Sequence, residues 1–170
     1  MTSFRATSVA IDLEAFRHNL RIIKRLVGPS VATMAIVKAD AYGHGAIQCA
    51  RTALDEKVNY LGVGIVQEGI ELRESGISSP ILILGGVYPD EVQSLIRHNL
   101  STSLSNLDLA QIISKQAQYA GKVANVHIKI DTGMGRLGVQ PDDFSCLFEN
   151  VIKDKNLKIN GIFTHLACAD

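Results

Sequence analysis

The chain has 170 residues and 46% of them are hydrophobic, which is enough for one domain with a substantial core. Seventeen Lys and Arg balance seventeen Asp and Glu, so there is no basic footprint for nucleic acid or an anionic membrane surface. No apolar run of about 18 residues could span a bilayer and no basic-then-apolar leader is visible, so we expect a cytoplasmic protein.

The three cysteines give no sign of a disulfide framework or a metal centre. Cys49, Cys146 and Cys168 are odd in number, widely spaced and outside any metal-binding pattern. We therefore expect reduced thiols and no metal site.

The first half of the chain alternates between strand and helix patterns. Asp12 is a candidate N-cap for a helix with apolar residues at three- and four-residue steps, and Gly28-Pro29 ends that helix. Further strands are expected over 31–37, 60–66 and 81–84, with helices that begin near Gly45, carry Ile70 and Leu72 to Gly76, and begin at Pro89.

The second half continues the alternation. After a weak strand over 100–104, Ser105 and Asp108 resemble a capping box that opens a helix reaching Gly121. The remaining expected elements are a strand over 123–131, a glycine-rich loop over 132–138, a helix from Pro141 and a strand over 157–164.

The strand over 123–131 has the clearest two-residue period. It places Val126, Ile128 and Ile130 on one face, and His127, Lys129 and Asp131 on the other. If helices cover the apolar face, the polar row points into a barrel or a cleft.

Six strand–helix alternations predict a parallel sheet with helices on its outer face. A doubly wound open sheet and a barrel both fit, but the candidate functional residues follow the first, fifth and sixth strands, as at a barrel mouth. A barrel needs eight strands and typically about 250 residues. We therefore predict one α/β domain over residues 1–170, made of the first six strand–helix units of a (β/α)8 TIM-type barrel.

Lys38 is the leading candidate for chemistry. It ends an apolar run, where burial disfavours the charged ammonium, and this is how a Schiff-base lysine is made. Tyr42, Gly43 and Gly45 follow, where a phosphorylated ligand would meet a loop that enters a helix. Taken alone, a lysine in this position more often ends a strand in solvent, and Tyr42 could equally be ordinary packing.

Two later loops carry further candidates. The glycines around Arg136 permit close backbone approach, and its planar guanidinium suits an anionic oxygen. His165 follows the last strand. The alternatives are an exposed loop arginine and a structural histidine, and Asp131 is interpreted as a hydrogen-bond acceptor at a strand end.

Three segments resemble the signatures of the alanine racemases, which are pyridoxal 5′-phosphate (PLP) enzymes of the barrel fold type. The segments are VKADAYGHG from Val37, KIDTGMGRLG from Lys129, and Thr164-His165-Leu166-Ala167. The resemblance implies that Lys38 binds PLP covalently and is catalytic, and that Tyr42 contacts the cofactor phosphate. It also implies that Arg136 contacts the cofactor phenolic oxygen and the substrate carboxylate, that His165 stacks beside the pyridine, and that Lys129 is carbamylated in some members.

The resemblance implies interconversion of L-alanine and D-alanine, which supplies D-alanine for peptidoglycan, in a homodimer. The sequences of the family continue beyond the part that this chain resembles. That continuation includes barrel strands seven and eight, a C-terminal β domain and the tyrosine that acts as opposing base. We therefore expect an N-terminal part of such an enzyme that self-associates and is weakly active or inactive alone.

Three alternatives remain open. A serine or broad-specificity racemase would share these motifs, because the elements that select among small amino acids come largely later in the family. A non-enzymatic PLP-binding barrel protein would bind the cofactor without turnover. A structural or interaction module would carry the motifs as relics.

Overall fold

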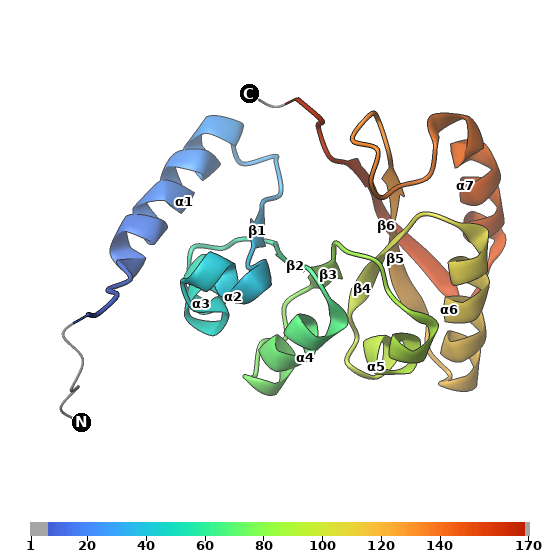
Figure 1. Ribbon diagram of the computed structural model, residues 1–170, viewed down its shortest axis with the longest axis horizontal. Helices are drawn as coiled ribbons and strands as arrows, with labels where there is room; N and C mark the ends of the chain where they lie inside the picture. Colours follow the sequence, from blue (N-terminus) through green and yellow to red (C-terminus); the bar gives the residue numbers. More distant parts are fainter. Residues whose placement is uncertain (1–6, 169–170) are drawn as a thin grey trace.

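The computed structural model describes residues 7–168 and shows six parallel strands that lie side by side in chain order (Figure 1). This arrangement confirms the predicted strand–helix units of a barrel. The strands are β1 (Met34–Ile36), β2 (Tyr60–Val63), β3 (Ile81–Ile83), β4 (Ser101–Leu104), β5 (Ala124–Ile130) and β6 (Leu157–Thr164). The helices are α1 (Leu13–Val27), α2 (Lys38–Gly43), α3 (Ala46–Asp55), α4 (Val66–Glu74), α5 (Val92–Arg97), α6 (Leu107–Tyr119) and α7 (Phe144–Lys153), with short 3-10 turns at Pro89–Glu91 and Pro141–Asp143.

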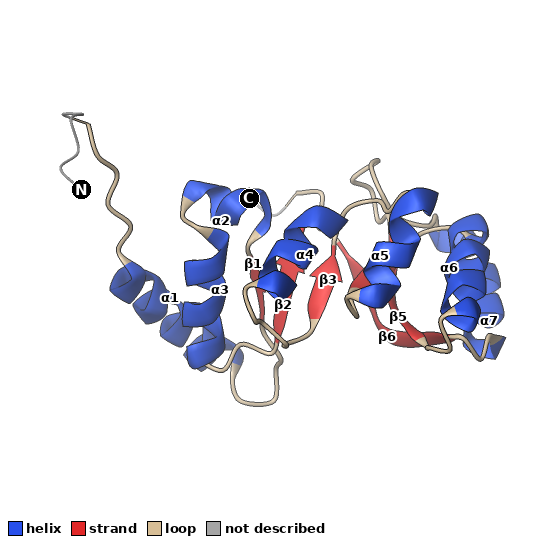
Figure 2. Ribbon diagram, turned by 90° about the horizontal axis from the view of Figure 1, so that it is seen from below, coloured by secondary structure: helices blue, strands red, loops and turns tan. Residues whose placement is uncertain are grey.

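The helices wrap around one side of the curved sheet. Figure 1 shows α3, α4, α5 and α6 following one another around the strands, and Figure 2 shows the same helices ranged along the row of strands. The core lies between these two layers, and all four residues of β4 are buried. The largest fully buried side chains of the core include Leu61, Leu72, Ile81, Ile83, Leu95, Leu104 and Ile113. The expected amphipathic helices therefore cover the outer face of the sheet.

Helix α1 stands at the edge of this assembly. Asp12 caps it as predicted, since its carboxylate accepts a hydrogen bond from the Ala15 amide at 2.9 Å. The helix ends at Gly28, which has a positive φ of 81°. Part of the expected apolar stripe packs against the core, but Ile23 and Val27 are 50% and 40% exposed. The core therefore covers only one end of the stripe, and α1 packs mainly against α3.

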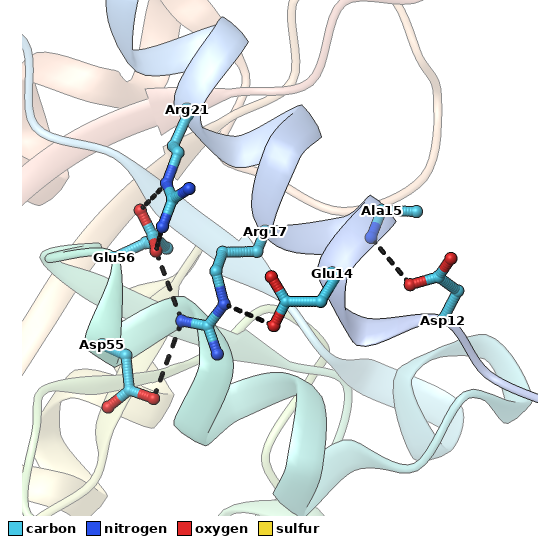
Figure 3. Close-up of polar contacts among 7 residues, drawn as sticks. All are labelled: Asp12, Glu14, Ala15, Arg17, Arg21, Asp55 and Glu56. Carbon is cyan, nitrogen blue, oxygen red and sulfur yellow. Dashed lines mark hydrogen bonds and ion pairs between the residues drawn. The ribbon is translucent and has the colours of Figure 1, made fainter.

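Charged side chains attach α1 to the end of α3 (Figure 3). Glu56 accepts hydrogen bonds from Arg21 at 2.6 and 2.8 Å and from Arg17 at 3.3 Å. Hydrogen bonding to these guanidinium groups, Arg21 first, lowers the pKa of Glu56 to about 2. Glu56 is therefore ionised throughout the neutral range and holds the two helices together.

Some expected boundaries were wrong. The strand expected over 60–66 ends at Val63, and Val66 is instead the first residue of α4. The strand expected over 31–37 is ordered as a strand only over Met34–Ile36. The capping box of Ser105 and Asp108 is also wrong, because Asn106 is the N-cap and its side chain accepts from the Leu109 amide at 2.8 Å.

A bulge changes the register between β5 and β6. Val126 pairs with Ile159, but His127 pairs with Gly161, which leaves Asn160 as an extra residue on β6. Before the bulge, Ile159 lies on the helix-covered face, whereas Gly161 and Phe163 oppose the inward-facing His127 and Lys129. The bulge therefore turns the end of β6 towards the inner face.

Other expectations can be compared directly with the described residues. Each of the three cysteines is free, as expected. Within residues 7–168, no helix is long and apolar enough to cross a membrane. The same part of the chain holds no group of three or more His, Cys, Asp or Glu side chains that could bind a metal ion.

Candidate active site

A pocket of about 400 Å³ lies at the carboxyl ends of the strands, and it brings together all five side chains predicted to form the site. These side chains are Lys38, Tyr42, Lys129, Arg136 and His165. The remaining lining comes from Met34, Ile36, Gly64, Leu84, Gly85, Leu137, Phe163 and Thr164. Segments more than 120 positions apart in the numbering thus meet at one opening, where barrel proteins place their active sites.

The chain after Lys38 forms a left-handed turn. Ala39, Asp40, Ala41 and Tyr42 all have φ between 51° and 57°, a conformation that costs roughly 1–2 kcal/mol for each residue with a side chain. The turn leaves Tyr42 61% exposed, with its ring centre 5.9 Å from Lys38 Nζ. Four strained residues in a row at a predicted site indicate a conformation that the surrounding structure holds in place.

Carboxylates on both sides stabilise this turn. Asp40 accepts a hydrogen bond from the Ala46 amide at 2.7 Å, which caps the start of α3. Glu68 accepts from the Ala39 amide at 2.7 Å and from the Gly64 amide at 2.6 Å. His44 does not line the pocket, and its Nδ1 lies 2.8 Å from the Ala41 carbonyl oxygen within the same loop.

The loop that carries Arg136 is organised by Asp131. The Asp131 carboxylate accepts hydrogen bonds from the amides of Gly133 and Gly135, both at 3.0 Å, and of Arg136 at 2.8 Å. These bonds, those from Gly135 and Gly133 foremost, lower the pKa of Asp131. The strand-end acceptor role expected for Asp131 is confirmed, and it leaves the Arg136 side chain exposed at the pocket.

A close backbone approach closes the base of the same loop. The Val139 amide donates to the Lys129 carbonyl at 2.8 Å, and the Asp131 amide donates to the Val139 carbonyl at 3.0 Å. Gly138 has a φ of 140°, and a Cβ there would lie 2.4 Å from the Asp131 nitrogen. Only glycine fits this position.

Lys129 lies on the inner face of β5 and is 6% exposed. Its Nζ is 3.4 Å from the Leu84 carbonyl oxygen and 5.5 Å from the centre of the Phe163 ring. Burial, followed by the positive charges of Arg136 and Lys38, lowers the pKa of Lys129. Its amine is therefore easier to deprotonate than that of an ordinary surface lysine.

His127 lies two residues before Lys129 on the same face and is also buried. Its ring makes edge contacts with Tyr60 and Phe163, with centres 6.0 and 6.5 Å apart. Burial lowers the pKa of His127, so the imidazole is neutral at neutral pH. Within residues 7–168 its Nε2 has no hydrogen-bond partner.

His165 is the last of the predicted residues, exposed just beyond β6. The strand end before it is fixed by Thr164, whose hydroxyl donates to the Ile130 carbonyl at 2.8 Å. The ends of β5 and β6 are thereby held together, and both Arg136 and His165 reach the pocket from them.

The charge of the pocket favours an anionic ligand. As far as residues 7–168 form its lining, the pocket contains Lys38, Lys129 and Arg136 and no carboxylate. None of these three side chains forms an ion pair within the described residues. Phosphate and carboxylate groups are the ligands that suit such donors.

Sequence reasoning missed Glu68 and Phe163. The three-residue spacing from Ile65 to Glu68 is typical of a carboxylate that caps a helix start, and it could have drawn attention to Glu68. Its bond to Ala39, 29 positions away, depends on the folded sheet and has no local signal. Local sequence does not distinguish Phe163 from an ordinary strand residue, because its position on the inner face depends on the bulge in β6.

Comparison with known proteins places the chain in one family. The family model described as "Alanine racemase, N-terminal domain" matches residues 11–170. An alanine racemase of Geobacter sulfurreducens is 43% identical over 166 residues, covering 98% of this chain and 44% of that protein. One from Symbiobacterium thermophilum is 39% identical over 170 residues, covering all of this chain and 45% of that protein.

Solved structures agree with the sequence comparison. The alanine racemase of Clostridium difficile 630 matches with a TM-score of 0.91 and 40% identity, over 94% of this chain and 42% of that one. The Bacillus anthracis enzyme with bound L-Ala-P matches with a TM-score of 0.88 and 28% identity, over 98% and 43%. The chain thus spans less than half the length of these relatives. Because the family model covers nearly all of its residues, the chain belongs to the alanine racemase family and corresponds to that family's N-terminal domain.

Proposed function

We propose that residues 1–170 form an incomplete PLP-binding barrel domain of an enzyme that interconverts L-alanine and D-alanine. The observation that carries the proposal is the convergence of Lys38, Tyr42, Lys129, Arg136 and His165 on one pocket. In a whole enzyme we propose a cytoplasmic homodimer that supplies D-alanine for peptidoglycan. Alone, the chain is expected to self-associate and to racemise poorly.

The pocket fits PLP by its chemistry. The cofactor carries a phosphate and a phenolic oxygen, and the substrate adds a carboxylate, whereas the described lining offers three cationic side chains without a carboxylate to neutralise them. Lys38 would hold the cofactor, Tyr42 its phosphate and Arg136 its phenolic oxygen. His165 would lie against the ring.

When bound, PLP supplies an aldehyde that a lysine amine can capture and an electron-withdrawing ring that acidifies the α-C–H of an amino acid attached to it. Lys38 Nζ would take or return the α-proton on one face of the substrate. Arg136 would orient the substrate carboxylate. Inversion also needs an acid–base group on the opposite face, since a single base returns the proton to the side it left.

We propose further that Lys129 carries a carbamate. Its burial and lowered pKa make the amine available as a nucleophile. The nitrogen of the neutral amine bonds to the carbon of CO2, one C=O π bond breaks with its electron pair going to oxygen, and the nitrogen loses one proton to solvent, which leaves an anion that can pair with Arg136. Carbon-13 NMR with labelled bicarbonate is expected to show one carbamate signal, absent in Lys129→Arg. The same signal in that variant would refute the assignment.

The covalent role of Lys38 gives the direct test of the proposed function. The chain is incubated with PLP, reduced with borohydride and digested, and the labelled peptide is identified by mass. We expect labelling at Lys38, loss of it in Lys38→Arg, and no change in the control Lys155→Arg, which alters an exposed lysine. Labelling that is spread over surface lysines, or unchanged in Lys38→Arg, would refute the proposal.

Turnover separates the remaining alternatives. D-Alanine formed from L-alanine at the rate of an ordinary enzyme would show that this chain needs no further part. Labelling of Lys38 without turnover of either alanine or serine fits both an incomplete racemase and a non-enzymatic PLP-binding protein. Addition of a purified C-terminal portion of a relative distinguishes them, since only the racemase would gain activity.

A further inference from the structure

We propose that Glu68 is a positioning residue for Lys38, holding the left-handed turn that presents the lysine to the pocket. This inference rests on the proposed function of Lys38. Glu68 itself does not line the pocket, so it acts through the backbone that follows the lysine.

The Glu68 carboxylate joins the carboxyl ends of two neighbouring strands. One oxygen accepts from the Ala39 amide at 2.7 Å, just beyond β1. The other accepts from the Gly64 amide at 2.6 Å and the Ile65 amide at 3.3 Å, just beyond β2. Hydrogen bonds to a charged acceptor are stronger than those between neutral groups, so this side chain is a firm link between the two loops.

The position of each of these hydrogen bonds matters for Lys38. The Ala39 amide belongs to the peptide bond that follows Lys38, and Ala39 is the first residue of the strained turn. Lys38 also lies directly against Gly64, since a Cβ built there would be 3.6 Å from Lys38 Cβ and 3.3 Å from the Glu68 carboxylate. Lys38, Gly64 and Glu68 therefore form one packed unit, in which the carboxylate holds the peptide group that follows the lysine and the Gly64 backbone packed against the lysine Cβ.

A simple helix cap would not explain this arrangement. Capping of α4 accounts for the bonds to Gly64 and Ile65, but it does not require the bond to Ala39. Glu91 provides the comparison, because it accepts from the Tyr88 amide at 2.9 Å three residues earlier and lies outside the pocket lining. Glu91→Gln is thus a matched control for a local cap.

The first test uses the chain without cofactor. In Glu68→Gln the new amide cannot accept from both strand ends with a charged group, so we expect the Ala39 amide to exchange with solvent roughly tenfold faster by NMR. Amides of β3 and β5 should be unchanged, and Glu91→Gln should leave Ala39 protected. Glu68→Asp, which keeps the charge but is one methylene shorter, should also expose Ala39. Unchanged Ala39 protection in both folded Glu68 variants would overturn the proposal.

The second test measures labelling of Lys38 by PLP and borohydride. We expect Glu68→Gln to slow it roughly tenfold and Glu91→Gln to leave it unchanged. Equal labelling rates in the wild type and Glu68→Gln would overturn the positioning role while the function of Lys38 stands. If the wild type is not labelled at Lys38, the proposed function fails, and the exchange of Ala39 alone decides whether Glu68 holds the turn.

Discussion

Cationic side chains at the two ends of the sheet differ in what they bind. At the amino ends of the strands they donate to backbone carbonyls at the ends of helices: Lys24 to Glu56 and Lys57, Arg51 to Ser75, Arg73 to His98 and Asn99, and Lys122 to Ile96 and Arg97. At the carboxyl ends, Lys38 and Arg136 have no ion-pair partner within residues 7–168, and Lys129 has one long bond to a carbonyl.

This difference separates charges that stabilise the fold from charges that are available to a ligand. A cation at a helix C-terminus satisfies carbonyls that have no partner in the helix and interacts well with the helix dipole. Burial first, and then the positive charges of Arg136 and Lys38, lower the pKa of the unmodified Lys129 amine, and an anion in the pocket would offset the repulsion among these cations. The amino ends of the strands therefore carry cations that stabilise the fold, whereas the carboxyl ends carry cations that remain available to a ligand.

Arg73 should give the largest effect on stability. Its guanidinium donates to four carbonyls, those of Ile77, Ser79, His98 and Asn99, at 2.7–3.0 Å. We expect Arg73→Ala to lower the free energy of unfolding by roughly 2–4 kcal/mol, because each of these acceptors loses a charged donor. Urea denaturation measures this loss, and Arg97→Ala, at an exposed arginine, is the control. A loss below about 0.5 kcal/mol for Arg73→Ala would contradict the division drawn here.

Two identical substitutions should change stability in opposite directions. Lys122→Met removes a donor to the Ile96 carbonyl at 3.1 Å and is expected to destabilise the chain by about 1 kcal/mol. In bicarbonate-free buffer, where Lys129 is the unmodified amine, Lys129→Met removes a buried positive charge near Lys38 and Arg136 and is expected to stabilise the chain by about 0.5–1 kcal/mol. Thermal unfolding of both variants at pH 7 tests the comparison, and destabilisation by both would show that Lys129 also serves the fold.

The smallest expected effect is a pH dependence at Glu56. Its folded pKa of about 2 lies below the ordinary value of 4.5, so its stabilising contribution is complete above pH 4.5 and is lost as the pH falls towards 2. Glu56→Gln should flatten stability over this window in urea titrations. Glu149→Gln, which removes an exposed pair with Lys153, should leave the profile nearly unchanged. A wild-type profile already flat between pH 4.5 and 2 would contradict the role of Glu56.

Much of the fold follows from local pattern. The last strand was expected over 157–164 and is observed as Leu157–Thr164, because turn residues bound its apolar residues on both sides. The inward row of β5 followed from its two-residue period. The cap of α6 could not be settled in the same way, since Ser105 and Asn106 are both good N-caps and the entry angle of the chain decides between them.

The site was predictable in composition but not in conformation. The motifs identified Lys38, Arg136 and His165. Because each follows a strand of a predicted parallel barrel, all three were expected at one opening. The left-handed turn had no such signal, because Ala39, Ala41 and Tyr42 are not residues that favour positive φ. Tertiary contacts impose it, among them the bond between Glu68 and Ala39, and contacts between distant segments cannot be read from local sequence.

The extra residue at Asn160 makes one length change in β6 easier to accommodate than its neighbours. Successive residues of a strand point to opposite faces, and deletion of Asn160 would make Ile159 and Gly161 consecutive while each kept its pairing with Val126 or His127. Phe163 would still oppose Lys129 on the inner face. Deletion of Lys158 would instead leave a regular strand with Ile159 on the inner face and Asn160 on the helix-covered face. Loss of Asn160 should therefore be tolerated better than loss of Lys158.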